Sequence, residues 1–166
     1  MPKKRNATTA KQKEDTTSGT FAVNRRARYD YEILDSIEAG LVLTGSEIKA
    51  LREGAGSIAE GYARIRDGEI WLFNTHIGPY GPARENHDSR RARKLLMHKR
   101  QIARWAEEIE TQPRTTLVPM RLYLTRGKAK VQIGLARGKR SYDKRDAIAK
   151  READRTIQRA LRHAQR

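Results

Sequence analysis

Basic side chains surround an aromatic ring in the segment "RGKRSYDKR", which covers residues 137–145. Lysine and arginine can neutralise backbone phosphates while an aromatic ring stacks on a base, and this combination suits RNA. Runs of positive charge are usually only solvated, so the ring of Tyr142 is what distinguishes this segment. Two more basic segments, "NRRAR" (24–28) and "RRARKLL" (90–96), have blander alternatives: a solvated arm and the charged face of an amphipathic helix.

Catalytic chemistry is poorly represented in the sequence. The four histidines are His76, His87, His98 and His163, and they lack the spacing of metal ligands. The run "HDS" (87–89) has the residue types of a catalytic triad, but sequence neighbours cannot converge on one substrate atom. There is no GxxxxGK[ST] or GxGxxG phosphate-binding loop. We therefore expect no enzyme activity, no metal site and no cofactor.

The composition indicates a polyanionic partner. The chain has 36 Lys and Arg against 20 Asp and Glu, a net charge of +16 and a pI near 10.6. Because neutralising phosphates releases condensed counterions, nucleic acid is the first candidate and an anionic membrane the second. The absence of cysteine fits a reducing compartment, and the polar start "MPKKRNATTAKQKEDTTSG" lacks the apolar core of a secretory signal. We expect a cytoplasmic protein that does not enter the membrane.

The positive charge lies mostly at the two ends. Residues 1–28 carry a net +6, residues 29–136 a net +3 and residues 137–166 a net +7. We predict three regions from this distribution and from composition. They are a disordered basic N-terminal arm (1–19), a folded domain (20–136) and a basic C-terminal tail (137–166) that is disordered when free. The apolar stripe of the tail is mostly alanine, which is too little to fold a helix alone.

Short β-rich segments dominate the middle of the chain. The alternation in "YDYEIL" (29–34) predicts a strand, which Gly40 is expected to end before a second strand in "LVL". "GSEIKALREG" (45–54) predicts a short helix. In "YARIRDGEIWLF" (62–73), the Asp-Gly pair predicts a tight hairpin turn.

A second hairpin and a longer helix complete the prediction. "LVPMRLYLTRGKAKVQIGLA" alternates on both sides of Gly127, and residues 89–110 show helical periodicity with Asp88 or Ser89 as the cap. About six strands with two or three helices predict a mainly β fold with flanking helices. We expect an OB-like, closed six-stranded antiparallel β-barrel.

These segments occur in the order and spacing of a known family. The sequence resembles small protein B, the bacterial SsrA-binding protein family, from about residue 20 to 155. The segments that carry the likeness are "NRRARYDYEI", "EAGLVLTGSEIKALREG", "GYARIRDGEIWLF", "HIGPY", "RRARKLLMHKRQI" and "ARGKRSYDKRDAIAKRE". The resemblance implies the OB-like barrel and a non-catalytic RNA-binding factor in ribosome rescue, or trans-translation. Such a factor binds the tRNA-like domain of transfer-messenger RNA and delivers it to ribosomes stalled on mRNA without a stop codon.

The resemblance also implies the partners. They are transfer-messenger RNA, the 70S ribosome with its ribosomal RNA, and elongation factor Tu in the delivery complex. The body would replace a missing anticodon arm, while the tail enters the empty mRNA channel next to the decoding centre and becomes helical only there. A permanent OB-type structural ribosomal protein is the alternative, and its stoichiometry would distinguish it. A rescue hydrolase would need a Gly-Gly-Gln loop, which the sequence does not contain.

Matching the motifs assigns roles to individual positions. The implied RNA-binding residues are Asn24, Arg25, Arg26, Glu38, Arg93, Lys94, Leu96, Gly138, Lys139 and Arg140. The implied ribosome-binding residues of the tail are Tyr142, Asp143, Lys144, Arg145, Lys150 and Arg151. Tyr142 stands where the family often has His, so stacking is open to it but protonation near neutral pH is not. Ser89 stands where a proline is frequent, so its loop lacks that rigid residue.

Two of these positions have open alternatives. Glu38 is an acceptor for base amino groups, a clamp on a neighbouring arginine, or an ordinary turn carboxylate. Leu96 is either a core residue of a helix or an apolar contact to RNA.

Overall fold

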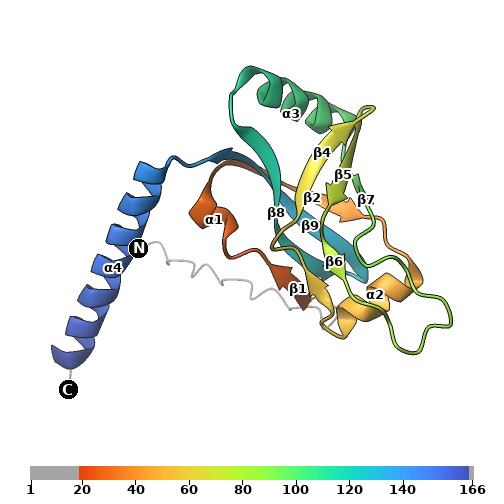
Figure 1. Cartoon of the computed structure of the whole chain (residues 1–166), viewed down its shortest axis with the longest axis horizontal. Helices are drawn as coiled ribbons and strands as arrows, with labels where there is room; N and C mark the ends of the chain where they lie inside the picture. The colour runs from red at the N-terminus through yellow and green to blue at the C-terminus, as the bar shows by residue number, and fades with distance from the viewer. Residues whose placement is uncertain (1–18, 165–166) are drawn as a thin grey trace, which may run out of the picture.

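The computed structural model describes residues 19–164, and strands dominate it (Figure 1). The elements, in chain order, are β1 (Gly19–Val23), α1 (Ala27–Asp30), β2 (Tyr31–Leu41), α2 (Gly45–Arg52), β3 (Gly56–Ser57), β4 (Tyr62–Arg66), β5 (Glu69–Phe73), β6 (His76–Ile77), β7 (Arg93–Leu96), α3 (Lys99–Thr111), β8 (Thr115–Thr125), β9 (Lys128–Gly138) and α4 (Ser141–Ala164). The predicted mainly β fold with flanking helices is confirmed.

Six strands close into an antiparallel ring. Hydrogen-bonded neighbours run β8, β4, β5, β7, β2, β9 and back to β8. One edge of β8 pairs with β9, and the other edge is shared between β4 and the additional strand β1. The joint between β4 and β8 is a single residue pair, Ala63 with Leu117, whereas β2 and β8 pair with β9 along most of their length. The ring therefore depends mainly on the long strands β2, β8 and β9.

Both predicted hairpins are present, and the backbone angles of their turn residues explain why the chain reverses at these points. Asp67 and Gly68 join β4 to β5 with φ angles of 52° and 72°. Arg126 and Gly127 join β8 to β9 with φ angles of 48° and 75°. Positive φ at both central residues matches the twist of the flanking strands, and glycine adopts it without steric cost.

The core fills the ring. Its buried residues from the strands include Ile70, Leu72, Leu95, Leu122, Val131, Ile133 and Leu135. The helices α3 and α2 lie at opposite ends of the ring (Figure 1), and each contributes a buried side chain, Trp105 and Leu51. The indole Nε1 of Trp105 donates to Oδ2 of Asp35 at 3.1 Å, so the one polar atom of this ring is satisfied.

The predicted helix over residues 89–110 is partly wrong. Its first part contains strand β7, and α3 begins at Lys99 with His98 as its N-cap instead of Asp88 or Ser89. In β7, Arg93 and Leu95 are buried and Leu96 is exposed, which is the alternation of a strand. An inward-pointing arginine hides this period from a search for apolar residues.

The expected break at Gly40 is also wrong. Strand β2 continues through Gly40 to Leu41, and Tyr29, which was expected in this strand, lies in α1. Gly40 pairs with Leu96 of β7, and a Cβ on Gly40 would lie 3.3 Å from the Cβ of Leu96. The glycine thus permits a close approach between two strands. The predicted helix over 45–54 is confirmed as α2.

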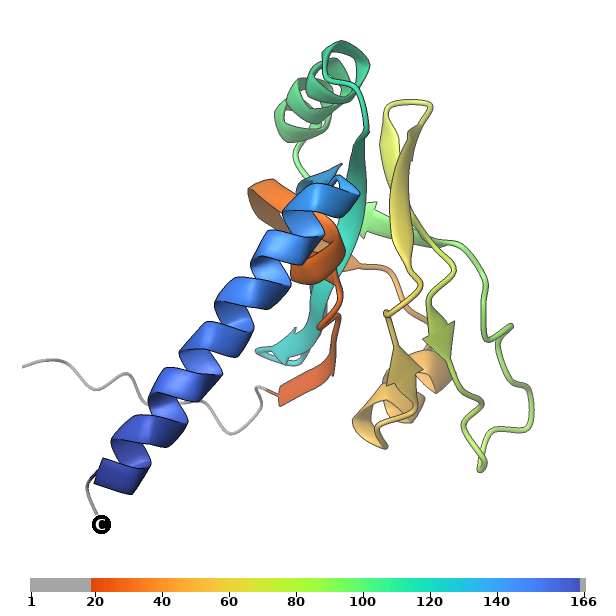
Figure 2. The same cartoon turned by 60° about the vertical axis from the view of Figure 1, so that its left-hand side comes forward.

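The two ends differ from the middle of the chain. Of the predicted N-terminal arm, only Gly19 lies within the described residues, where it begins β1. Strand β9 includes Arg137 and Gly138, two residues of the predicted tail. Residues Ser141–Ala164 of the tail form α4, which begins beside α1 and projects away from the ring (Figures 1 and 2). Every α4 side chain that the structure describes, at Arg145 and from Ile148 to Arg162, is exposed, so this part of the helix packs no face against the body.

Candidate nucleic-acid interface

Glu38 lies on the outside of β2 and is held by two neighbouring strands. Its carboxylate accepts hydrogen bonds from Lys130 Nζ on β9 and from the Tyr123 hydroxyl on β8. The bond from Lys130, then that from Tyr123, holds the pKa of Glu38 below its ordinary value of 4.5. Partial burial and the bond to Glu38 raise the pKa of Tyr123. At neutral pH the site therefore has an ionised carboxylate, clamped by a lysine and a tyrosine and not by an arginine.

A hollow of about 550 Å³ lies beside Glu38. It is lined by Glu38, the β4–β5 turn, strand β7 and the first turn of α3, and we call it the Glu38 hollow. Leu96 lines it with 56% of its surface exposed, whereas its neighbour Leu95 is 2% exposed. Lys94 also lines it and forms an ion pair with Glu69. Leu96 is consequently a surface residue, which excludes the core alternative, and its contact with RNA stays a prediction.

Arg93 lies inside the protein, although the resemblance made it an RNA contact. Its side chain is 0% exposed, and its Nε donates to Oε1 of Glu47 at 2.9 Å. Its Nη1 donates to the carbonyl of Thr75 at 2.8 Å. A guanidinium with these buried partners cannot reach a ligand on the surface. Arg93 therefore fixes β7 against α2 and positions the residues around it.

Glu47 is a structural residue that sequence reasoning missed. Burial alone would raise its pKa, but hydrogen bonds and charge from Arg91 and Arg93 and the amide of Thr44 lower the pKa overall. Arg91 Nη2 lies 2.5 Å from Oε2 of Glu47, and the Thr44 amide donates to the same oxygen at 2.8 Å. A threonine followed three residues later by a glutamate is a capping-box signature, so the sequence did contain a signal for part of this role.

The loop before β7 is fixed without a proline at Ser89. The carbonyl of Ser89 accepts hydrogen bonds from the Ile77 amide at 3.0 Å and from Arg93 Nη2 at 3.2 Å. Nearby, Nδ1 of His87 and the hydroxyl of Ser46 share a hydrogen bond of 2.9 Å. These bonds connect the loop to α2 and β6, so the backbone position of Ser89 does not depend on a rigid ring.

Asn24 is buried at the start of α1. Its Nδ2 donates to the carbonyl of Pro119 at 3.2 Å, and its Oδ1 accepts the Ala27 amide at 3.1 Å. Both ends of the amide are thus used inside the protein. Arg25 and Arg26, which follow it, are exposed, and Arg26 Nε lies 3.8 Å from Asp30 Oδ2. Asn24 therefore sets the direction from which two exposed arginines leave the body.

The end of β9 docks on the same short helix. The Lys139 amide donates to the carbonyl of Asp30, and Lys139 Nζ donates to the carbonyl of Arg28, each at 3.0 Å. These bonds bring segment 24–28 and segment 138–140 side by side. We call the cations that they gather, Arg25, Arg26, Lys139 and Arg140, the junction cluster, because α4 begins immediately after it. Gly138 ends β9, and a Cβ on it would meet no atom within 4 Å.

The predicted body residues thus form two groups and not one. Strand β2 runs from Tyr31, next to the junction cluster, to Glu38. A strand rises about 3.3 Å per residue, so these seven steps separate the groups by roughly 23 Å. A ligand that meets both groups must extend along the outside of the ring.

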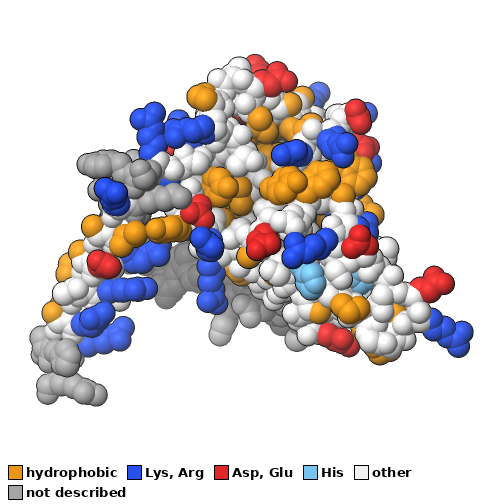
Figure 3. All heavy atoms as spheres, viewed as in Figure 1, with side chains coloured by type: hydrophobic (Ala, Val, Ile, Leu, Met, Phe, Trp, Pro, Cys, Tyr) orange, Lys and Arg blue, Asp and Glu red, His pale blue; other side chains and the backbone are white. Residues whose placement is uncertain are grey.

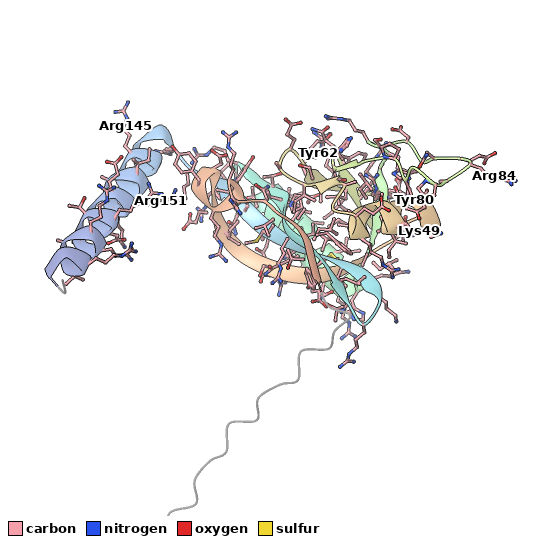
Figure 4. All side chains as sticks on the ribbon, turned by 90° about the horizontal axis from the view of Figure 1, so that it is seen from below. Lys49, Tyr62, Tyr80, Arg84, Arg145 and Arg151 are labelled. Atoms are coloured by element: carbon pink, nitrogen blue, oxygen red, sulfur yellow. The ribbon has the colours of Figure 1, made fainter. Side chains whose placement is uncertain are left out.

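The structure describes the side chains of some of the predicted tail residues but not of others. Arg145, Lys150 and Arg151 are exposed on α4, and Figure 4 shows Arg145 and Arg151 extending from this helix. Tyr142, Asp143 and Lys144 belong to the first turn of α4, but their side chains lie outside the described part of the structure. Their contacts therefore remain a prediction.

Residues 19–164 do not present the side-chain cluster of a metal site or the helix of a membrane span. This part of the chain contains no group of three or more His, Asp or Glu side chains that could hold a metal ion. Among its helices there is also none with the length and apolar character needed to cross a membrane.

Comparisons with known proteins agree on one family. The model of the SmpB protein family matches residues 21–163. The SsrA-binding protein of Thermobifida fusca (strain YX) is 54% identical over 155 residues, covering 92% of this chain and 96% of that protein. The SsrA-binding protein of Roseiflexus sp. (strain RS-1) is 56% identical over 147 residues, covering 87% and 92%. A chain in the solved structure "tmRNA-SmpB: a journey to the center of the bacterial ribosome" is 45% identical with a TM-score of 0.61, covering 80% of this chain and 94% of that chain.

Proposed function

The chain belongs to the SmpB protein family, and on this basis we propose that it is an RNA-binding ribosome-rescue factor. It binds the tRNA-like domain of transfer-messenger RNA and takes part in trans-translation on ribosomes stalled on mRNA without a stop codon. The names of its relatives and the ribosome-bound structural neighbour support this role. The net charge of +16 supports a polyanionic ligand on independent physical grounds.

One structural observation supports separate roles for the ring and the tail. The folded ring presents the Glu38 hollow and the junction cluster, while α4 exposes all of its described side chains. A helix that buries no face gains little from packing, so contacts with a partner are needed to offset the conformational entropy that it loses on ordering. We propose that the ring binds the tRNA-like domain and that the tail enters the empty mRNA channel of the ribosome.

Each body residue has a proposed part in RNA binding. Glu38 accepts hydrogen bonds from base amino groups, because its carboxylate is ionised and fixed in place. Leu96 supplies an apolar contact, and Lys94 a charge, from the same hollow. The junction cluster neutralises phosphates. Asn24 and Arg93 act from inside the protein by positioning these groups.

The tail acts through stacking and charge. We propose that Tyr142 stacks on a base of ribosomal RNA near the decoding centre, with Asp143 beside it. Lys144 and Arg145 pair with phosphates, and Lys150 and Arg151 continue the contact along the channel. The exposure of Arg145, Lys150 and Arg151 on one helix supports this order.

Delivery and location follow from the same role. A tRNA-like ligand that must reach the ribosomal A site suggests elongation factor Tu as a further partner, and work on 70S ribosomes suggests the cytoplasm. The chemistry needed is recognition of RNA and not a change in covalent bonds, so we propose no catalytic residue.

The RNA that accompanies the protein in cells tests the function. We expect transfer-messenger RNA to dominate the RNA that copurifies with an affinity-tagged chain, and the protein to be substoichiometric to ribosomes. Recovery of one copy per ribosomal subunit after a high-salt wash, without enrichment of transfer-messenger RNA, would instead support a structural ribosomal protein.

A further inference from the structure

The outer face of the β4–β5 hairpin alternates aromatic rings with arginines. Tyr62 pairs across the hairpin with Phe73, and Arg64 pairs with Trp71. The rings of Tyr62 and Phe73 are stacked, with centroids 5.6 Å apart and planes 20° apart. The opposite face of the hairpin, with Ala63, Ile70 and Leu72, is buried in the core. The outward rings are therefore not needed to fill the core.

The arginines of this hairpin lie over the rings. The Arg64 guanidinium is 5.1 Å from the centroid of Tyr62, and the Arg66 guanidinium is 6.0 Å from that of Phe73. Neither arginine forms a salt bridge with any residue that the structure describes. A ring orders a guanidinium without cancelling its charge, so its N–H donors remain available to a phosphate. We call Tyr62, Arg64, Arg66, Trp71 and Phe73 the aromatic-arginine face.

This face is open to solvent and connects the two groups of predicted body residues. Tyr62 is 36% exposed, and it lines a second hollow, of about 320 Å³, together with Asn24 and Arg26. At the other end of the hairpin, Gly68 and Glu69 line the Glu38 hollow. Figure 3 shows hydrophobic side chains with lysine or arginine next to them over the part of the molecule that Figure 1 assigns to β4 and β5. In Figure 4, Tyr62 lies on the body, apart from the arginines of α4.

We propose that the aromatic-arginine face binds a run of unpaired RNA nucleotides. Aromatic rings on the outside of a β-ring offer platforms for bases, and unpaired arginines between them offer charge to the backbone that joins those bases. Stacked rings favour this ligand over an acidic protein surface, which would satisfy the arginines but not the rings. Rings stack on any base, so this binding depends little on base sequence. The inference rests on the proposed RNA-binding function and adds a second ligand site to it.

The two tryptophans of the chain provide a direct readout. Trp71 lies on the aromatic-arginine face, whereas Trp105 is fully buried. Titration of the full-length protein with a short oligouridylate is expected to quench tryptophan fluorescence to saturation. In Trp71→Phe the quenching is expected to disappear, while the anisotropy of a fluorescein-labelled oligouridylate still reports binding.

Matched variants locate the site. Tyr62→Ala is expected to weaken oligouridylate binding roughly 5- to 150-fold, the range of one lost base-stacking contact. Arg66→Gln, at an exposed position, is expected to weaken it and to flatten its salt dependence. Arg159→Gln removes the same charge from an exposed position of α4 and is expected to change the affinity little.

The outcomes separate this inference from the proposed function. If Tyr62→Ala and Arg66→Gln bind oligouridylate as tightly as the wild type, the face is not an RNA site. Quenching of Trp71 by polyglutamate but not by oligouridylate overturns the inference in favour of a protein partner. Failure of the wild type to bind the tRNA-like domain, with the oligouridylate results as expected, counts against the proposed function alone.

Discussion

Arg93 of β7 donates a hydrogen bond of 2.9 Å to Glu47 of α2, and neither side chain is exposed to solvent. Arg91 binds the second carboxylate oxygen of Glu47 at 2.5 Å. The strand that presents Leu96 to the Glu38 hollow is thus fixed to a helix by buried charges. The geometry of the candidate interface consequently depends on residues that cannot touch the ligand.

Removal of one partner of this buried pair should strongly destabilise the fold. Arg93→Met is expected to lower the free energy of unfolding by about 3–5 kcal/mol, because Glu47 keeps its buried charge with fewer partners. Lys94→Met is the matched control, since Lys94 pairs with Glu69 at a partly exposed position. Its expected loss is below about 1 kcal/mol. Urea denaturation measures both, and equal losses would show that the buried pair has no special weight.

Acid should weaken the fold through the same carboxylate. The pKa of Glu47 is below its ordinary value of 4.5 in the folded protein, so the unfolded chain takes up its proton at a higher pH. The stabilising contribution is therefore complete above about pH 4.5 and is lost as pH falls through the folded pKa. We expect the free energy of unfolding to fall more steeply with acid in the wild type than in Glu47→Gln. Parallel curves below pH 4.5 would contradict this.

Leu96 and Leu95 should separate binding from stability. Leu96→Ala is expected to weaken binding to the tRNA-like domain while the melting temperature hardly changes, because most of this side chain is already in water. Leu95→Ala, at the neighbouring buried position, is expected to cost about 2–5 kcal/mol of stability. Calorimetry and gel-shift titration of both variants make the comparison. A large drop in melting temperature for Leu96→Ala would exclude its role as a contact.

Glu38 should contribute to specificity. Glu38→Gln keeps the shape of the side chain but removes the charge that Lys130 and Tyr123 hold in place. We expect binding to the tRNA-like domain to weaken more than binding to generic duplex RNA, since only specific contacts use a fixed acceptor. Filter-binding titrations with the two RNAs measure the ratio. If both affinities fall equally, Glu38 acts on the fold and not on recognition.

The tail should be dispensable for one activity and required for another. A chain that ends at Ser141 is expected to bind transfer-messenger RNA and to melt like the wild type, because α4 packs no described side chain against the ring. It is expected to lose peptide tagging on stalled ribosomes. Within the full chain, Tyr142→Phe should be nearly silent and Tyr142→Ala damaging, because stacking needs the ring and not the hydroxyl. Loss of RNA binding together with tagging in the truncated chain would refute this division.

The isolated tail peptide tests the same prediction from another side. We expect circular dichroism to show little helix in plain buffer, because a mostly alanine stripe offers no packing to a helix of this charge. Strong helicity without RNA would mean that the tail enters its site already folded.

Local patterns predicted the elements whose structure depends on local chemistry. The Asp-Gly turn at 67–68 and the turn at Gly127 are fixed by backbone angles that glycine adopts easily. Helix α2 is capped by Thr44, whose amide donates to the carboxylate of Glu47 three residues later. In each case the residues that decide the structure are close together in the sequence.

The wrong predictions concern contacts between distant segments. The sequence predicts a surface cation at Arg93, because nothing near it identifies Glu47, 46 residues away, as its partner. The sequence predicts a strand end at Gly40, because its close approach to Leu96 exists only once β2 and β7 have paired. The clamp on Glu38 likewise comes from Tyr123 and Lys130, 85 and 92 residues away. Local periodicity contains no information about such pairs.

The order in which the ring can form follows from the pairing of its longest strands. Strand β2, over residues 31–41, pairs with β9, over residues 128–138, and β1 pairs with β8. Strand β1, and all of β2 except the two residues that pair with β7, therefore have no strand partner until the last hairpin has been synthesised. Since contacts between distant residues must overcome the entropy of closing a long loop, such topologies fold slowly. We infer that the nascent protein stays open until residue 138 has emerged.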